Sequence, residues 1–243
     1  MRPLEPPPVR RLFVPDLGYT LFEVDLKRAD AQIVARESGD EPLLQDFRDN
    51  RDIYTENAAW LYNIPMEKVT TAQYQKNKAA VHAINYYCKA RTIAKTLGVS
   101  TASAEEFMED WWFKKHPGIR QWHKDISKQL QKTRTVRNVY GFRKYYTDRL
   151  DNLLSQALAW IASSTVSITI NTAMVNVYRH LPSVQILLQI HDSILGQVRT
   201  EDVDKLFPAI LEECSIEIPY EPPLTIPETI KASEASWGDV TTW

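Results

Sequence analysis

Two strand-like segments that lie far apart in the sequence, each with an aspartate at its end or turn, limit the fold more than any other feature. Residues 20–26 (TLFEVDL) alternate apolar and polar side chains, which predicts a strand with Asp25 near its end. Residues 184–198 predict a second pair of strands, joined by a tight turn that contains Asp192. A Rossmann fold or a barrel would instead alternate strand and helix regularly. The pattern therefore predicts an α+β protein.

Helical patterns fill the sequence between these strands and follow them. We predict helices at residues 29–37, within 46–62, from 65 onward, and at 72–97, 104–115, 119–132, 150–180 and 202–214. Gly98 would end the helix at 72–97, and Pro117-Gly118 would separate the two helices that flank it. Residues 135–146 (TVRNVYGFRKYY) predict a β-hairpin.

Charge is unevenly distributed along the chain, although the net charge is only −2. Residues 114–149 contain eleven Lys or Arg and two acids, whereas residues 201–243 contain ten acids and two lysines. The basic middle predicts either a surface that binds a polyanion or a solvated helix face with no partner. Hydrophobic residues make up 44% of the chain, which is enough for the core of one or two domains.

Cysteine content and terminal composition exclude several classes of protein. Cys88 and Cys214 form neither a disulfide framework nor a metal cluster, which fits a reduced, intracellular setting. No apolar run approaches the ~20 residues that cross a membrane, and the N-terminus has no signal-peptide core. Its prolines favour an extended arm over residues 1–18. We therefore expect a cytoplasmic protein with no membrane partner.

Asp25 and Asp192 are candidate metal ligands. Two-metal phosphoryl transfer requires hard oxygen ligands that bridge two magnesium ions about 3.5–4 Å apart. One ion activates the attacking hydroxyl and the other neutralises the leaving pyrophosphate. Carboxylates at the ends of adjacent strands would be rigid enough for this role. An aspartate at a strand end is more often a turn or cap residue, so the two positions alone leave both interpretations open.

A stripe of four side chains follows one face of the helix predicted at residues 72–97. Tyr74, Lys78, His82 and Tyr86 are spaced by four, so they share a slowly drifting face. Such a face could bind a nucleoside triphosphate, with Lys78 at the phosphates, His82 at the sugar or base and Tyr86 at the base. The alternative is the wet polar face of an ordinary amphipathic helix.

The segment YGFRKYY at residues 140–146 interleaves aromatic and basic side chains. Such side chains can hold phosphates and stack on bases. A charged surface hairpin with no ligand would show the same composition.

Taken in order, these segments resemble family A DNA polymerases, the group that includes bacterial DNA polymerase I and many phage replicative enzymes. Residues 25–40, which begin DLKRAD and end ESGD, resemble motif A, usually DYSQIELR followed by SGD. The resemblance implies that Asp25 binds metal through its carboxylate and Leu26 through its backbone carbonyl. Asp30 falls where the family has the Glu that excludes a ribose 2′-OH, and it keeps the charge on a shorter side chain.

The helix stripe resembles motif B, the fingers helix, usually RxxxK followed by NFGxxYG. Lys78 falls on the lysine of the motif, His82 on its aromatic residue and Tyr86 on its tyrosine. The resemblance implies that these three residues and Asp30 bind the incoming nucleotide.

The remaining motifs follow in the family's order. Residues 189–193 (QIHDS) resemble motif C, usually VHDE, in a variant known from phage members. This implies that Asp192 binds metal and His191 contacts the primer terminus. Residues 113–123 (FKKHPGIRQWH) resemble the YPGI segment, and residues 141–145 resemble the GRRRY element that lies near template and primer. We therefore expect Arg143 and Lys144 to bind DNA.

Three positions depart from the family pattern. Tyr74 replaces the arginine that grips the triphosphate, and a phenol cannot offer the bidentate fork of Arg. Tyr87 replaces the glycine after the motif B tyrosine, which places a large ring where the template approaches, so we include it among the DNA-binding residues. Ser163 aligns with the glutamine that usually precedes motif C.

The resemblance implies an α+β fold with a family A polymerase palm, built on a small antiparallel sheet, and helical fingers. The expected domains are an arm at 1–18, palm at 19–40, fingers at 41–133, and palm with a C-terminal tail at 134–243. We expect the thumb and exonuclease domains to be absent and a second chain to supply them, with residues 1–11 docking on it. Primer-template DNA, dNTP and two magnesium ions are the expected partners and cofactors. Without the thumb's phosphate contacts, the chain alone would bind DNA weakly.

The leading hypothesis is a phage-type split DNA polymerase subunit that adds deoxynucleotides to a primer 3′ end in the cytoplasm of a bacterial host. One alternative is a catalytically degenerate fragment that binds DNA or a replication protein, as Tyr74, Tyr87 and Ser163 would suggest. Another is a single-subunit RNA polymerase, against which Asp30 and the HDS form of motif C argue.

Overall fold

A computed structural model describes residues 8–147 and 153–243. The contacts within the chain group it into two units, one of residues 30–163 and one of residues 8–29 with Ser164–Trp243. We describe each unit by itself. Residues 1–7 of the predicted extended arm lie outside the described residues. The next part of that arm, Pro8–Leu12, is a 3-10 helix (η1), so the extended conformation expected there is wrong.

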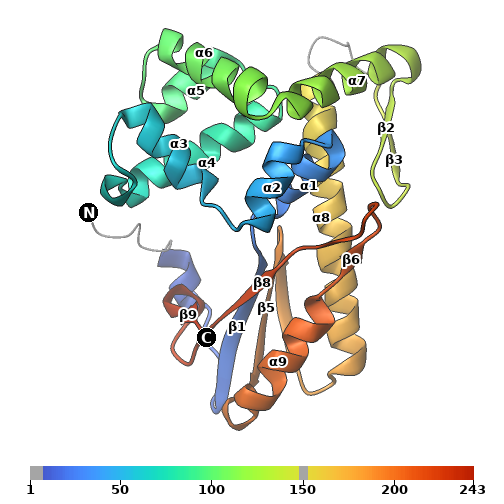
Figure 1. Ribbon diagram of the computed structural model, residues 1–243. Helices are drawn as coiled ribbons and strands as arrows, with labels where there is room; N and C mark the ends of the chain where they lie inside the picture. Colours follow the sequence, from blue (N-terminus) through green and yellow to red (C-terminus); the bar gives the residue numbers. More distant parts are fainter. Residues whose placement is uncertain (1–7, 148–152) are drawn as a thin grey trace. The chain divides into compact units, whose positions relative to one another are not determined.

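The second unit is built on a five-stranded antiparallel sheet with the strand order β4-β5-β1-β8-β9 (Figure 1). The strands are β1 Tyr19–Leu26, β4 Gln185–Ile190, β5 Ser193–Arg199, β8 Glu228–Ser233 and β9 Thr241–Thr242. A separate two-stranded ladder joins β6 (Glu217–Ile218) to β7 (Leu224–Thr225). This confirms the expected small antiparallel sheet. The strands from β6 onward were not predicted from the sequence.

β1 lies in the middle of the sheet and is covered on both faces. On one face, Phe22 meets Phe207 of helix α9 (Val203–Cys214) with ring centroids 5.8 Å apart. On the other face, Leu21 packs with Leu195 and Trp237. The side chains on both faces of β1 are therefore buried. The alternation from which the strand was predicted comes from its few polar positions and not from a face exposed to solvent.

Helix α8 (Leu153–His180) is long and apolar. It contains an 18-residue window with a mean hydropathy of 1.4, so among the described residues this one helix could cross a membrane by length and composition. The sequence prediction that no segment approaches this limit was therefore wrong. Half of that window is buried within the protein, and the core helix of a folded domain meets the same criterion.

The first unit is almost entirely helical (Figure 1). Its described elements are α1 Ala29–Ser38, α2 Glu41–Arg48, α3 Ile53–Tyr62, the 3-10 helix η2 Met66–Lys68, α4 Thr71–Asn85, α5 Ala90–Leu97, α6 Thr101–Glu109, the π-helix η3 Asp110–Lys115, α7 Pro117–Thr133, β2 Thr135–Arg137 and β3 Arg143–Tyr145. The strands β2 and β3 pair in the predicted hairpin.

The helix predicted at residues 72–97 is in fact two helices. α4 ends at Asn85 because Tyr87 adopts the left-handed conformation, with φ +62°, and its N–H donates to the Ile84 carbonyl. α5 then begins at Ala90 and ends at Leu97, where Gly98 closes the helix as predicted. α7 begins at Pro117, earlier than expected, because the first turn of a helix needs no N–H from proline.

Asp40 joins the N-termini of two helices of the first unit. Its carboxylate accepts the N–H of Leu43 at 2.9 Å, which caps α2, and the N–H of Gly118 in the first turn of α7 at 2.8 Å. Nδ1 of His116 lies 3.0 Å from the same carboxylate. Asp40 is therefore a buried anchor for the start of both helices.

Candidate functional site

Asp25 and Asp192 lie on adjacent strands of the second unit. Asp25 is one residue before the end of β1, opposite Ser193, the first residue of β5. The N–H of Leu26 donates to the carbonyl of Asp192 at 3.2 Å, so the two backbone segments are hydrogen-bonded where these strands meet at one end of the sheet. Both aspartates are half-buried. The structure thus brings together two residues separated by most of the chain.

The turn that carries Asp192 is held by its own side chains. His191 has a left-handed backbone, with φ +51°, and its carbonyl accepts a hydrogen bond from Gln189 Nε2 at 2.7 Å. Ser193 Oγ donates to the Ile190 carbonyl at 3.0 Å. These contacts fix the direction of the turn, and the side chain of His191 remains exposed beside Asp192.

The oxygen atoms of Asp25 and Asp192 at this end of the sheet fit a hard divalent cation. Carboxylate oxygens and backbone carbonyls are the ligands that magnesium prefers. The described residues contain no group of three His, Cys, Asp or Glu side chains arranged for a metal ion.

In the first unit, Asp30, His82 and Tyr86 lie together. His82 Nδ1 is 3.7 Å from Asp30 Oδ2, and the rings of His82 and Tyr86 meet edge to face at 4.7 Å. Burial, and then the charge of the Asp30 carboxylate, raise the pKa of the Tyr86 hydroxyl far above its usual value. Tyr86 is therefore neutral at any physiological pH and can offer a hydrogen-bond donor.

The helix stripe is only partly presented to solvent. Lys78 and His82 are exposed one turn apart on α4, as predicted. Tyr74 is half-buried, and its ring packs edge to face on Tyr54 at 5.8 Å. The residue at the position of the motif B arginine therefore packs within the first unit.

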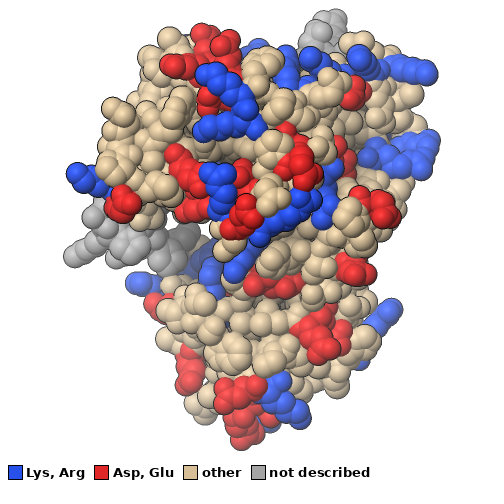
Figure 2. All heavy atoms as spheres, in the orientation of Figure 1, with Lys and Arg blue, Asp and Glu red and all other residues tan. Residues whose placement is uncertain are grey.

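The hairpin β2–β3 presents basic and aromatic side chains, as expected from residues 140–146. Arg143 is exposed, and its Nη1 donates to the Tyr145 hydroxyl at 3.0 Å. Lys144 Nζ lies 5.2 Å from the ring centroid of Tyr146, whose pKa burial raises to about 12. Lys and Arg side chains gather over this hairpin and the end of α7 (Figure 2).

A cluster around Tyr87 was not foreseen from the sequence. Its ring stacks on Trp112 at 5.8 Å with an interplanar angle of 25°, and meets His123 edge-on at 5.4 Å. The guanidinium of Arg120 lies 5.1 Å from the centroids of both the Tyr87 and Trp112 rings. The sequence signal for this cluster was the run of aromatics at residues 111–113 followed by Arg120. It combines rings with a cation, as residues 140–146 do.

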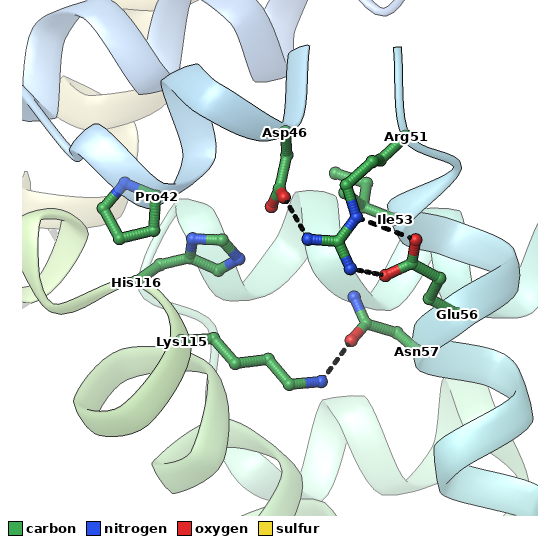
Figure 3. A pocket seen from close by; sticks show the side chains of 8 residues that line it. All are labelled: Pro42, Asp46, Arg51, Ile53, Glu56, Asn57, Lys115 and His116. Atoms are coloured by element: carbon green, nitrogen blue, oxygen red, sulfur yellow. Dashed lines mark hydrogen bonds and ion pairs between the residues drawn. The ribbon is translucent and has the colours of Figure 1, made fainter. Parts of the chain in front are cut away.

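A small polar pocket lies beside α2 and α3 in the first unit (Figure 3). Its lining residues are Pro42, Asp46, Arg51, Ile53, Glu56, Asn57, Lys115 and His116. Arg51 forms ion pairs with both Asp46 and Glu56, and Lys115 Nζ donates to Asn57 Oδ1 at 2.7 Å. Because these polar groups bind one another, the pocket is a structural network to which we assign no ligand.

Comparison with known proteins identifies the family of this chain. The family model described as DNA polymerase family A matches residues 2–239. The chain belongs to DNA polymerase family A. It is 28% identical over 229 residues to the thermostable DNA polymerase I of Thermus filiformis, covering 88% of this chain and 27% of that protein. It is 27% identical over 245 residues to DNA polymerase I of Treponema pallidum, covering 95% of this chain and 24% of that protein.

A solved structure extends the comparison to the fold. The polymerase domain of Pol1 from M. smegmatis, in complex with DNA primer-template and dNTP, matches with a TM-score of 0.82 and 23% identity, over 97% of this chain and 44% of that one. The α+β polymerase fold and the family resemblance are therefore confirmed. The domain bounds, the roles of the individual site residues, the phage type and the split subunit stay predictions.

Proposed function

We propose that this family A chain catalyses the DNA-templated addition of deoxynucleotides to a primer 3′ end. The observation that carries the proposal is the pairing of Asp25 and Asp192 on hydrogen-bonded strand ends of one sheet. Two carboxylates held by a rigid sheet are suited to phosphoryl transfer, in which positioning and charge neutralisation supply most of the catalysis.

Asp25, Asp192 and the backbone carbonyl of Leu26 would hold magnesium. Bound there, magnesium would neutralise charge on the transferring phosphoryl group and increase the acidity of the primer hydroxyl. His191 stands next to Asp192 on an exposed turn, where its ring can contact the primer terminus. The sheet's contribution is to keep these groups fixed while the substrates change.

The residues of α4 would bind the incoming nucleotide. The exposed ammonium of Lys78 provides a point charge for the phosphates. Asp30 lies against His82 and Tyr86, so a sugar near these residues meets a carboxylate and two rings. This crowding favours deoxyribose, because the 2′-OH of ribose would need additional space. Incorporation of deoxynucleotides and ribonucleotides, compared for wild type and Asp30→Ala, tests this selection.

The DNA-binding role rests on the basic hairpin. Arg143 and Lys144 lie on β3 within the basic surface, and their ring contacts hold them close to Tyr145 and Tyr146. Together with Tyr87, they are the proposed contacts to primer-template DNA. Phosphate contacts of this kind supply much of the affinity for DNA and make it sensitive to salt.

The proposal includes a partner chain whose thumb would add phosphate contacts to the DNA. The chain spans about a quarter of the length of the curated relatives it matches. We propose that a partner chain carrying the thumb and exonuclease functions works with it, as a split polymerase of phage type in a bacterial cytoplasm. Co-purification followed by mass spectrometry would identify such a chain.

Primer extension with magnesium, with and without candidate partner chains, tests the activity. Asp25→Asn and Asp192→Asn should each lower the rate by roughly 100-fold or more, because each removes several kcal/mol of charge stabilisation. Asp204→Asn, at an exposed position of α9, is the matched control and should leave the rate unchanged. Activity that survives both substitutions would refute the assigned mechanism.

The alternative is a fragment that binds DNA or a replication protein without catalysis. The packing of Tyr74 on Tyr54 favours it, because no arginine reaches the triphosphate from that position. Nucleotide binding distinguishes the two functions. Absence of dNTP binding in the presence of primer-template and partner would support the alternative.

A further inference from the structure

A pocket of about 340 Å³ lies in the second unit, away from Asp25 and Asp192. Thr20 at the start of β1, Thr200 after the end of β5 and Glu234 after the end of β8 line it. Thr20 and Asp25 are five positions apart on β1, which is roughly 17 Å along an extended strand. Ligand pockets measure about 300–1,000 Å³, so this one suits a single side chain or a small ligand. It has no part in the proposed reaction.

The charged side chains that line this pocket are acidic. They are Asp204, in the first turn of α9, and Glu234, and both are exposed. Among the described residues, neither carboxylate forms an ion pair, and no Lys, Arg or His lines the pocket. The hydroxyls of Thr20 and Thr200 lie 3.0 Å apart and bond each other. The pocket therefore favours a cation as its ligand.

The indole of Trp243 also lines the pocket. Its ring meets Phe207 edge to face at 5.2 Å, and its backbone N–H donates to the Ile230 carbonyl at 3.2 Å. The side chain is nevertheless 50% exposed, so the ring is held in place while half of it stays open. Tryptophan is the side chain whose ring attracts cations most strongly. A carboxylate beside such a ring suits arginine, because a guanidinium stacks on rings and forms paired hydrogen bonds with carboxylates.

The strand β9 borders the same pocket through Thr241 and Thr242. It is the last strand in the sheet order, and among the described strands it pairs with β8 alone (Figure 1). An extended peptide can add to such an edge through backbone hydrogen bonds, while a pocket beside the edge selects one of its side chains. Two residues provide few backbone bonds, so the pocket must supply most of the specificity. The edge favours a peptide over a free cation.

We propose that this pocket binds an arginine side chain from an extended segment of a partner protein, and that the segment pairs with the open edge of β9. The guanidinium would lie between the Trp243 ring and the Glu234 carboxylate. Glu234 is the main counter-ion, because the N-terminus of α9 already offsets part of the charge of Asp204. The same helix N-terminus makes an anion the alternative ligand.

Isothermal titration of the full chain with short capped peptides tests the proposal, without primer, nucleotide or metal. The peptides carry arginine, citrulline, lysine or glutamate between the same β-favouring neutral residues. Citrulline keeps the shape of arginine and removes its charge, so its peptide should bind roughly tenfold more weakly or worse. The lysine peptide should bind more weakly than the arginine peptide, because an ammonium has no planar fork. Acetyl-argininamide, which has the side chain but no extended segment, should also bind more weakly than the arginine peptide.

Substitutions separate the charge from the ring. Glu234→Gln should weaken binding of the arginine peptide by roughly tenfold and leave the citrulline peptide unchanged. Glu212→Gln, at an exposed position of α9 outside the pocket, is the matched charge control and should have no effect. Trp243→Phe keeps a ring beside Phe207 and should weaken binding of the arginine peptide less than Trp243→Ala does. Tyr178→Ala, at another exposed ring, is the aromatic control.

The proposal is overturned if the arginine peptide does not bind, if the citrulline peptide binds as tightly, or if Glu234→Gln leaves arginine-peptide binding unchanged. Preference for the glutamate peptide would instead identify an anion site at the start of α9. Equal binding of acetyl-argininamide and the arginine peptide would refute the pairing of a segment with β9. None of these outcomes depends on catalysis at Asp25 and Asp192.

Discussion

Removing the Asp40 carboxylate should destabilise the first unit far more than removing an ordinary helix cap. Asp40 is only 2% exposed and accepts hydrogen bonds from the backbone of both α2 and α7. Its Oδ1 also meets His116 Nδ1 at 3.0 Å, and the His116 ring lies 4.2 Å from that of Trp111. The substitution Asp40→Ala therefore disconnects three donors at one buried point.

The magnitude follows from these contacts. Loss of the α2 cap should cost about 1 kcal/mol. The two other donors, on Gly118 and His116, are left in a buried place, at about 1–3 kcal/mol each. Asp40→Ala should therefore lower the free energy of unfolding by about 3–7 kcal/mol. Asp40→Asn keeps Oδ1 but turns Oδ2 into an NH₂ that faces the Gly118 N–H, so about half of that loss is expected.

Asp52 provides a matched control. It caps α3 through the N–H of Thr55 at 3.2 Å, but it is exposed and has no second helix to hold. Asp52→Ala should cost about 1 kcal/mol. Urea unfolding followed by circular dichroism measures both changes, since the first unit is mostly helical. Hydrogen exchange should show the loss of protection in the first turns of α2 and α7 for the Asp40 variants alone.

Equal destabilisation by Asp40→Ala and Asp52→Ala would refute the reasoning, because burial and the second helix would then contribute nothing. Gly118→Ala gives an independent check. A Cβ atom at Gly118 would lie 2.8 Å from the Asp40 Cα, so the added methyl group must break the same contact from the other side. It should destabilise the same helix turns.

Three further predictions concern buried groups. Burial lowers the pKa of His123 from 6.5 to about 4. The neutral ring therefore contributes its full stability above about pH 6.5, and up to about 3 kcal/mol is lost as the pH falls towards 4. Urea unfolding across this pH range should show the loss, and His123→Gln should flatten the dependence of the unfolding free energy on pH. Gly196→Ala should cost roughly 1–3 kcal/mol, because its Cβ would lie 2.4 Å from the Phe22 ring; an unchanged urea midpoint would contradict this. Burial, with two nearby carboxylates, raises the pKa of the Cys214 thiol to about 12; mass spectrometry after thiol labelling should therefore find Cys88 modified in the native protein and Cys214 only after unfolding.

The parts of the fold that the sequence predicted are those with a strong local pattern. The strand with Asp25 alternates apolar and polar residues, and the strands on either side of Asp192 are six and seven residues long and rich in Ile, Leu and Val; both formed as predicted. The strands β6, β7 and β9 are two residues long, and so short a segment has no period to detect. β6 and β7 form by pairing with each other and β9 by pairing with β8, and a two-residue segment does not encode such a partner.

The break between α4 and α5 was missed for a different reason. A helix usually ends at glycine or proline, and residues 86–89 contain neither. The family comparison had placed a glycine at Tyr87, and that glycine was the signal that the backbone turns there. Tyr87 has the left-handed conformation that a glycine would have signalled, so the end of the helix was concealed in the sequence.

The departures from the family pattern acquire a physical interpretation only with the structure. From the sequence, Tyr74 and Tyr87 both looked like lost contacts. In the fold, Tyr74 has an aromatic partner twenty residues away in Tyr54, and Tyr87 has Trp112 and Arg120. A decaying site has no reason to maintain a strained backbone under an ordered ring. The Tyr87 cluster therefore favours a chain whose surface has been adapted at this point over one that has lost its function.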